Sequence, residues 1–356
     1  MKNRDGLRPL IAGFIHRLRQ SLQQEKVTLK STSDTASWTK IGLLELSHRM
    51  IYQPSTLALF GEINPSSIEK DFQQFDEHFH YFYANIPGRI FSWLFPEALK
   101  ARSRLNESWL KNFNPSRESE FMQARMTLFR DHADWLPETD IGCCQTGLLW
   151  GSLGNTIPAV FWALFYILRD SKAVETITQE INTNLPYFSL DELPDEEIWT
   201  PEQLNSCVYL DSAVNEVLRI AGAAFLTRKC KQEAQLVLQD GRTLTVKPNE
   251  IIAYFAGVTH IDPKLFPEPE KFIFDRFLNK NPDTIPGYLP FGAGKHMCPG
   301  RFFAKNEMKI SVAILLRYTE YKLIDTDKIP QPKEQRVGVG VAPPNEDIPI
   351  MYRLKV

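Results

Sequence analysis

A chain of 356 residues that is 43% hydrophobic and 24% charged has an ordinary globular composition and can bury a large core. Its formal net charge of -2, with no block of Lys or Arg residues, excludes nucleic acid as an expected partner. The five cysteines are few for this length and contain no Cys-x-x-Cys pair, which argues against a disulfide framework and against a structural zinc site.

The N-terminal region predicts an amphipathic helix over residues 4–24, whose apolar residues recur at helical spacing. We expect these residues to form a core face, and a membrane-surface helix is the alternative: Leu7, Leu10, Ile11, Phe14, Ile15 and Leu18. The apolar run is too short for a signal peptide. A polar, Ser/Thr-rich loop is expected over residues 25–37, and helical patterns return over 38–60, 66–80 and 97–112.

Residues 141–168 contain no charged side chain and are long enough to span a bilayer. Polar and helix-breaking residues near their middle would be costly in lipid, so we favour a helix buried in a large domain. Pro158 has no N–H for the carbonyl of Gly154, and we expect that carbonyl to be free beside Asn155 and Thr156. The opening predicts a small polar notch, with a packing kink as the alternative.

The second half of the chain changes from a helical pattern over residues 200–221 to short strands. Asp-Gly separates two apolar runs and predicts a hairpin, and the strands are expected at 236–238, 244–246 and 251–255. A meander rich in proline and aromatic residues, then a helix over 299–317 and further short strands, complete the pattern. The sequence therefore predicts a mainly α fold with a small β portion, as a single domain over residues 1–356.

The run Pro-Phe-Gly-Ala-Gly-Lys-His-Met-Cys-Pro-Gly-Arg at residues 290–301 is the strongest functional signal. A thiolate can approach a large flat cofactor only where the backbone is thin, as glycine makes it. Cys298 precedes a helix expected to begin near Pro299, and the positive end of that helix favours a thiolate. Phe291 can shield the sulfur, and His296 is placed to reach a cofactor carboxylate. An inert buried thiol is the alternative.

This loop resembles the signature of the cytochrome P450 superfamily, matched at Phe291, Gly294, His296, Cys298 and Gly300. The resemblance implies haem b as the cofactor and Cys298 as the axial thiolate ligand of its iron. These five residues are therefore the expected cofactor-binding loop.

Three further marks of the superfamily are present. Glu216-Val-Leu-Arg219 resembles its Glu-x-x-Arg helix motif, and Asp-Arg276-Phe resembles the meander element whose arginine completes a triad. Helical spacing puts Glu216 and Arg219 on one face, and with Arg276 we expect a buried network that fixes the loop behind the haem. Arg228 corresponds to a partner of a haem propionate, for which a guanidinium is well suited.

One branch of the superfamily is more similar than the rest. Residues 149–159 and 338–348 resemble the cholesterol and oxysterol 7α-hydroxylases, sterol 12α-hydroxylase and prostacyclin synthase. These proteins carry asparagine where most of the superfamily carries an acidic residue, and Asn155 occupies that position here. By comparison with them, we expect a P450 fold that lacks its N-terminal membrane anchor and first elements.

The resemblance implies a monooxygenase that hydroxylates an apolar lipid, either a sterol or oxysterol or a fatty-acid derivative. Oxygen and electrons from NADPH-cytochrome P450 reductase would be required, and Thr156 with Asn155 would organise water that delivers protons. An endoperoxide isomerase of the prostacyclin synthase type is one alternative, and a haem-poor lipid-binding form is another. An apolar substrate is also favoured by the central helix, where we expect three apolar side chains to face the iron: Leu153, Ile157 and Val160.

Two surfaces are expected to bind partners. Basic residues beside the cysteine loop would dock an acidic redox partner, with a solvated face as the alternative: Lys295, Arg301, Lys305 and Lys309. By resemblance we expect the cytosolic face of the endoplasmic reticulum membrane, without a transmembrane anchor in this chain. Peripheral attachment is expected through an aromatic segment, which in the alternative simply packs between helices: Tyr81, Phe82, Tyr83, Ile86, Phe91, Trp93, Leu94 and Phe95.

Overall fold

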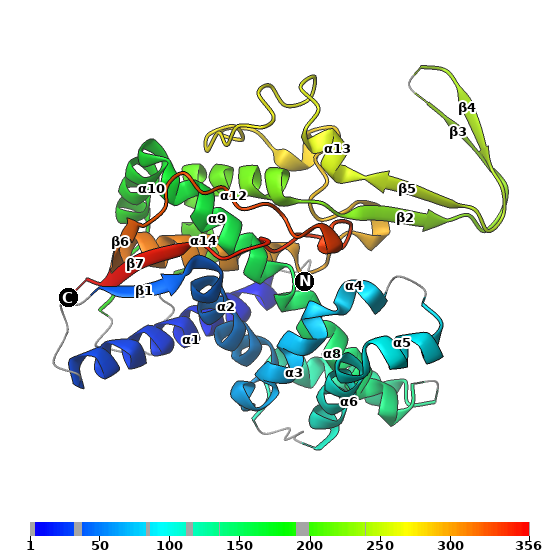
Figure 1. The fold of residues 1–356 in the computed structure, drawn as a ribbon, viewed down its shortest axis with the longest axis horizontal. Helices are drawn as coiled ribbons and strands as arrows, with labels where there is room; N and C mark the ends of the chain where they lie inside the picture. The colour runs from blue at the N-terminus through cyan, green and yellow to red at the C-terminus, as the bar shows by residue number, and fades with distance from the viewer. Residues whose placement is uncertain are drawn as a thin grey trace.

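The computed structural model describes residues 4–31, 38–82, 86–111, 117–134, 136–189, 199–238 and 240–355. Helices form the body of this part of the chain, and small antiparallel sheets lie at its edges (Figure 1). The helices in chain order are α1 (Arg4–Ser31), α2 (Leu43–Phe60), α3 (Pro65–Glu77), α4 (Phe79–Phe82), α5 (Gly88–Leu94), α6 (Pro96–Lys111), α7 (Glu120–Asp131), α8 (Glu138–Leu153), α9 (Thr156–Arg169), α10 (Ser171–Asn184), α11 (Pro201–Ser206), α12 (Val208–Ala221), α13 (Ala256–His260) and α14 (Arg301–Tyr318). The predicted mainly α class is confirmed.

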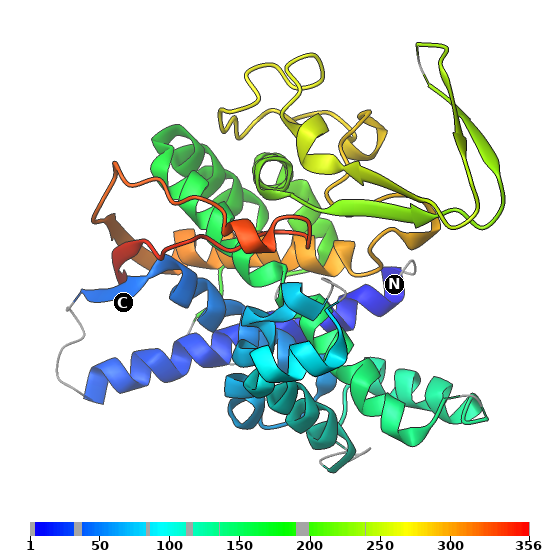
Figure 2. The ribbon, with the colours of Figure 1, turned by 45° about the vertical axis from the view of Figure 1, so that its right-hand side comes forward.

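The strands build three small sheets. A three-stranded sheet has the order β1 (Thr39–Gly42), β7 (Pro349–Leu354) and β6 (Thr319–Leu323). The two hairpin-like pairs are β2 (Phe225–Lys229) with β5 (Ile251–Phe255), and β3 (Ala234–Val237) with β4 (Thr243–Val246). The β3–β4 pair turns at Gly241, whose φ of 82° suits glycine, and it extends away from the body (Figure 2). The hairpin predicted around Asp-Gly is confirmed.

Helix α9 lies at the centre of the core, where it contacts α2, α10, α12 and α14. Burial on all sides explains why this part of the sequence carries no charge before Arg169. Of the described residues, the stretch Thr139–Arg169 is long and apolar enough to cross a membrane, but 78% of its most apolar part is buried inside the fold. The structure therefore agrees with the expected core helix.

The N-terminal helix α1 packs an apolar face on α2 and α14. Five of the six predicted face residues are buried, which confirms the core assignment: Leu10, Ile11, Phe14, Ile15 and Leu18. The helix continues to Ser31, so the loop expected over 25–37 is wrong for residues 25–31, and residues 32–37 lie outside the described part. The Tyr352 hydroxyl of β7 donates a hydrogen bond to Glu25 and so connects this last part of α1 to the sheet.

Other local predictions needed correction where distant segments decide the structure. Residues 39–42 form β1 rather than the start of a helix, because they pair with β7 in register Ile41↔Ile350. Helices α7 and α10 were not predicted, although both carry an N-terminal capping residue, Ser119 and Asp170. The helical stretch near 200–221 is divided at Cys207 into α11 and α12.

Candidate functional site

The cysteine loop runs from β5 and the meander into α14. Gly292 and Gly294 have φ values of 75° and 68°, a region that glycine enters without strain. The N–H of Cys298 donates to the carbonyl of Phe291 over 2.9 Å and closes the loop. Helix α14 begins at Arg301, two residues later than expected, and the Arg301 guanidinium donates to the Cys298 carbonyl over 3.1 Å. The loop thus holds Cys298 in front of the N-terminus of α14.

The other expected binding residues lie around this loop. Phe291 is half-buried against the main core, while Gly294 and His296 are exposed. Arg228 reaches over from β2 and donates to the carbonyl of Ala293 over 3.0 Å. The structure therefore brings Arg228 beside the cysteine loop, as the resemblance implies.

The residues present fit a haem. Cys298 is a half-buried free thiol, and a Cβ added at Gly300 would lie 3.9 Å from its sulfur, in van der Waals contact with it. No group of three or more His, Cys, Asp or Glu residues in the described part could hold a metal ion. A single thiol in a glycine-rich loop suits a haem, whose ring supplies the other ligands of the iron.

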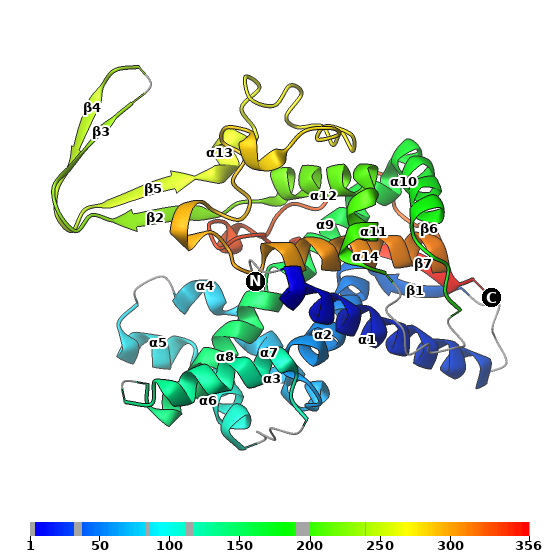
Figure 3. The same ribbon diagram turned by 180° about the vertical axis from the view of Figure 1, so that it is seen from behind.

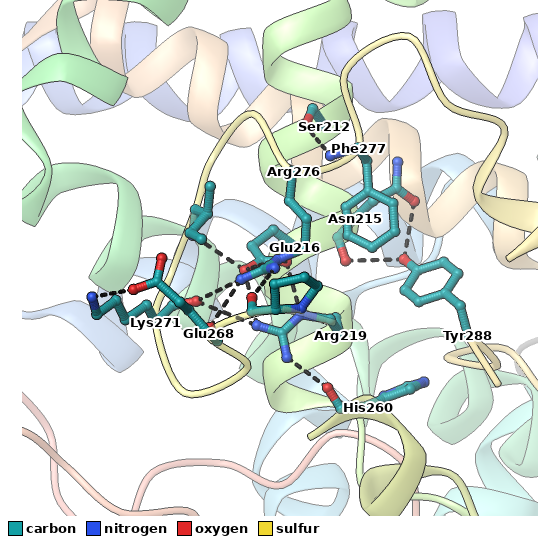
Figure 4. A network of polar contacts seen from close by, with 12 residues as sticks. Ser212, Asn215, Glu216, Arg219, His260, Glu268, Lys271, Arg276, Phe277 and Tyr288 are labelled. Carbon is teal, nitrogen blue, oxygen red and sulfur yellow. Dashed lines mark hydrogen bonds and ion pairs between the residues drawn. The ribbon is translucent and has the colours of Figure 1, made fainter. Parts of the chain in front are cut away.

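A buried ion network fixes the meander behind the loop (Figure 4). On α12, the Arg219 guanidinium donates to both carboxylate oxygens of Glu216, over 2.8 and 2.9 Å. Arg276 donates to the same two oxygens, each over 2.9 Å. The side chains of Glu216 and Arg219 are fully buried and that of Arg276 is 8% exposed. The three residues predicted from the sequence motif thus meet in one cluster.

The network reaches the cysteine loop through His260, which the sequence did not single out. Arg219 donates to the carbonyl of His260 over 2.6 Å, and His260 Nε2 accepts from the N–H of Leu289 over 3.1 Å. Burial lowers the pKa of His260 to about 4, so its ring is neutral near pH 7 and can accept this bond. Leu289 directly precedes the loop, and the contact therefore links the ion network to it.

The break between α8 and α9 differs from the expectation. The Gly154 carbonyl is not free, because Arg336 donates to it over 3.4 Å. The Asn155 side-chain oxygen accepts from the N–H of Val341 over 3.0 Å, and the buried Thr156 hydroxyl donates to the Ser152 carbonyl over 2.7 Å. A strap from the C-terminal region, here defined as residues 336–341, therefore occupies the predicted notch.

Arg336 is itself held by a distant carboxylate. It is 3% exposed and donates to Asp76 of α3, over 3.0 Å to the side chain and 2.6 Å to the carbonyl. Trp150 of α8 donates to the same carboxylate over 2.8 Å. Close packing of the strap also needs Gly340, since a Cβ there would lie 2.1 Å from the Asn155 oxygen. No local pattern pointed to Arg336 or Asp76.

Two expectations about side chains near the site are corrected. Lys309 is buried and pairs with Asp211 over 3.2 Å, and Lys305 approaches the same carboxylate over 3.5 Å, so these lysines are not a free docking face. Leu153, Ile157 and Val160 are buried in the core, and Leu153 and Ile157 border a small pocket beside Arg336 and Pro344 rather than the cysteine loop. Three residues on the outward face of α8 are exposed instead: Cys143, Gly147 and Gly151.

The aromatic segment divides into a packed and an exposed part. Phe91 is buried and packs on Phe82 and Phe95, with ring centroids 4.6 and 5.2 Å away. Trp93 is 79% exposed, and its neighbours Ile90 and Leu94 are exposed as well. Phe91 is therefore a core residue, contrary to the expectation, and Tyr83 lies outside the described residues.

The cysteine loop, the buried Glu-Arg-Arg cluster and the broken central helix are together the features of a haem-thiolate protein. Comparison with known families matches residues 14–350 to Cytochrome P450. The chain belongs to this family and is a cytochrome P450 monooxygenase, an enzyme class with a haem iron held by a cysteine thiolate. The predicted family and cofactor are confirmed.

Curated relatives match nearly the whole chain. The 25-hydroxycholesterol 7-alpha-hydroxylase of Rattus norvegicus is 30% identical over 89% of this chain and 80% of its own length. The cholesterol 7-alpha-monooxygenase of Cricetulus griseus is 32% identical over 92% and 68%. The 7-alpha-hydroxycholest-4-en-3-one 12-alpha-hydroxylase of Homo sapiens is 28% identical over 98% and 73%. The resemblance to the sterol hydroxylase branch is thereby confirmed.

Proposed function

We propose that the chain, as a single haem-thiolate domain over residues 1–356, hydroxylates a sterol or a similarly apolar lipid with O2 and electrons from NADPH-cytochrome P450 reductase. The observation that carries the proposal is the similarity of almost the whole chain to three hydroxylases whose substrates are sterols. When bound, the haem supplies the activation of oxygen, for which thiolate ligation is suited.

Residues of the loop hold the cofactor in this proposal. Cys298 is the axial ligand, and the thin backbone at Gly294 and Gly300 lets the ring approach. Phe291 excludes water from the sulfur. His296 and Arg228 offer cations or donors to the two cofactor carboxylates, and Arg228 already lies 3.0 Å from the loop carbonyl of Ala293.

Thr156 and Asn155 organise the proton supply. The Thr156 hydroxyl donates a hydrogen bond to the Ser152 carbonyl, so the lone pairs of the hydroxyl oxygen remain to accept a hydrogen bond from water. The Asn155 oxygen is fixed by Val341, which leaves its amide hydrogens as donors. Asparagine does not titrate, and the proton itself comes from water held by these two residues.

In this proposal, exposed side chains form the contacts with the reductase and with the membrane. Lys295, exposed on the loop, and the half-buried Arg301 are the basic contacts for the reductase, because Lys305 and Lys309 pair with Asp211. At the endoplasmic reticulum membrane, Ile90, Trp93 and Leu94 of α5 form the lipid contact. Vesicle flotation tests this: an Ile90→Ser/Trp93→Ser/Leu94→Ser variant should lose binding, and equal binding by variant and wild type would contradict it.

Turnover with defined components tests the reaction. Purified holoenzyme, NADPH and reductase should convert cholesterol or 25-hydroxycholesterol to a product heavier by one oxygen atom. Omission of NADPH should abolish this product, and Cys298→Ser is the inactive control. Rearrangement of a prostaglandin endoperoxide without NADPH, together with no sterol oxidation, would instead identify the isomerase.

A further inference from the structure

A cavity of about 950 Å³ is lined by residues of α2, α3, α6, α7 and α8. Figure 3 shows α3, α6, α7 and α8 close together in the lower part of the molecule. Its wall on α7 carries three apolar side chains, Met122, Met126 and Phe129. Trp109 of α6 stacks on Phe60 of α2, with ring centroids 4.5 Å apart, and lines the opposite side. Charged residues also line it, among them Glu62, Glu118 and Arg130. A volume of this size, with an apolar part and a few polar groups, is that of sites that hold drug-sized organic ligands.

This cavity is separate from the candidate haem site. Its wall on α8 is formed by Ile141 and Gln145. Gly147 and Gly151 lie on the outward face of the same helix, where an added Cβ would meet nothing within 4 Å. Two residues correspond to about 200° of helix rotation, so Gln145 and Gly147 point to opposite sides of α8. None of the residues that line the cavity belongs to the cysteine loop, and Gln145 points away from the exposed face of α8 at Gly147 and Gly151.

Gln145 is a polar group in this apolar wall and is only 2% exposed. Its oxygen accepts from the Arg125 guanidinium over 3.0 Å, which fixes the orientation of the amide. Its nitrogen donates to Met122 Sδ over 3.1 Å and to Met126 Sδ over 3.3 Å. A thioether is a weak acceptor, so this buried amide donor is incompletely satisfied.

We propose that the cavity is a second ligand site, for an apolar molecule of lipid size that carries one hydroxyl or carbonyl oxygen. That oxygen accepts the Gln145 amide hydrogens in place of the methionine sulfurs. The flexible side chains of Met122 and Met126 then repack along the apolar body of the ligand. The proposal goes beyond the proposed function, because the ligand bound here is not placed for reaction at the Cys298 loop.

Photolabelling tests the site with 6-azi-5α-cholestan-3β-ol, a photoreactive sterol with one hydroxyl. Irradiation of the holoenzyme, followed by peptide mass spectrometry, should place adducts on α7 and on residues 105–110. Met126→Trp places a bulky ring in the α7 wall beside Gln145 and should reduce α7 labelling about tenfold, the loss expected when a bulky side chain overpacks a binding site by roughly 1.4 kcal/mol. Leu128→Trp is the matched control, because Leu128 is 54% exposed and does not line the cavity.

A second variant keeps the test informative if Met126→Trp does not fold. Gln145→Leu leaves the volume but removes the amide, and should weaken labelling by the sterol about fivefold, as loss of one hydrogen bond does. Labelling by the same probe without its hydroxyl should not change. Adducts confined to other parts of the chain, or equal α7 labelling in wild type, Met126→Trp and Gln145→Leu, would overturn the proposal.

Discussion

Two buried arginines hold the two sides of the candidate site, and they differ in how far their partners lie along the chain. Arg219 pairs with Glu216 one helical turn away, and both side chains are fully buried. Arg336 pairs with Asp76, whose side chain is 28% exposed, and reaches Gly154 only at 3.4 Å. The cluster behind the cysteine loop is thus closed and dry, whereas the support of the helix break is partly open to water.

This difference has an energetic consequence. A carboxylate that neutralises two buried guanidinium groups cannot be removed without leaving both charges unpaired. Loss of a partly exposed carboxylate costs less free energy, because water can take over part of its hydrogen bonding. We therefore expect damage to the cluster to prevent cofactor binding, and damage at the helix break to alter catalysis in a folded holoenzyme.

The largest effect is expected from Glu216→Ala. Removal of this carboxylate should destabilise the fold by about 3–5 kcal/mol and abolish stable haem incorporation. Urea unfolding and haem content measure both effects. Glu268→Ala is the control, since Glu268 forms an exposed ion pair with Lys271 and its loss should change neither quantity. Wild-type haem content in Glu216→Ala would show that the cluster does not support the loop.

A second effect concerns Glu307 on α14, the helix that follows the loop. Burial raises the pKa of this carboxyl from 4.5 to about 8, against one hydrogen bond from Ser55 of α2. The folded state therefore keeps a proton that the unfolded chain loses above pH 4.5, and this stabilisation disappears as the pH rises through 8. Wild type should lose about 2 kcal/mol between pH 6 and pH 8 relative to Glu307→Gln. Parallel pH profiles of the free energy of unfolding would contradict the assignment.

The smallest change in stability is expected from Asp76→Ala. Loss of the partly exposed carboxylate should cost about 1.5 kcal/mol, the low end for hydrogen bonds to a charged group, because the Asp76 carbonyl still accepts from Arg336. Haem content should stay at the wild-type level. Because Arg336 then loses its anchor, we expect the strap to loosen at Gly154, which Arg336 bonds, and at Asn155, which Val341 bonds. The yield of product for each NADPH consumed should fall. Glu77→Ala, the neighbouring exposed acid on α3, is the control. An unchanged yield would show that the strap does not position the helix break.

The sequence predicted the parts of the site whose residues act through local spacing. Glu216 and Arg219 lie on one helix, and the cysteine loop is a continuous run, so each could be recognised from a short segment. Arg276 was added by the resemblance to the P450 superfamily. The core face of α1 was predicted because its apolar period is uninterrupted.

The remaining features depend on contacts between distant segments. Strand β1 exists because β7 pairs with it, and Arg336 meets Asp76 across 260 positions. Lys309 is buried where it meets Asp211 of α12 and two acceptors of α11, the Leu204 carbonyl and the Asn205 side chain. A charged residue in a helix gives no local sign of such a partner, and tertiary packing overrides the expectation that it faces solvent.

The central claim, that Cys298 is the thiolate ligand of the haem iron, is tested most directly by the absorbance of the reduced carbon monoxide complex. Wild type and Cys230→Ala, which changes a half-buried cysteine outside the loop, should both give the Soret band of a thiolate-ligated haem. Cys298→Ala should lack this band even if it retains some haem. A purified Cys298→Ala protein with the unchanged thiolate Soret band would contradict the assignment.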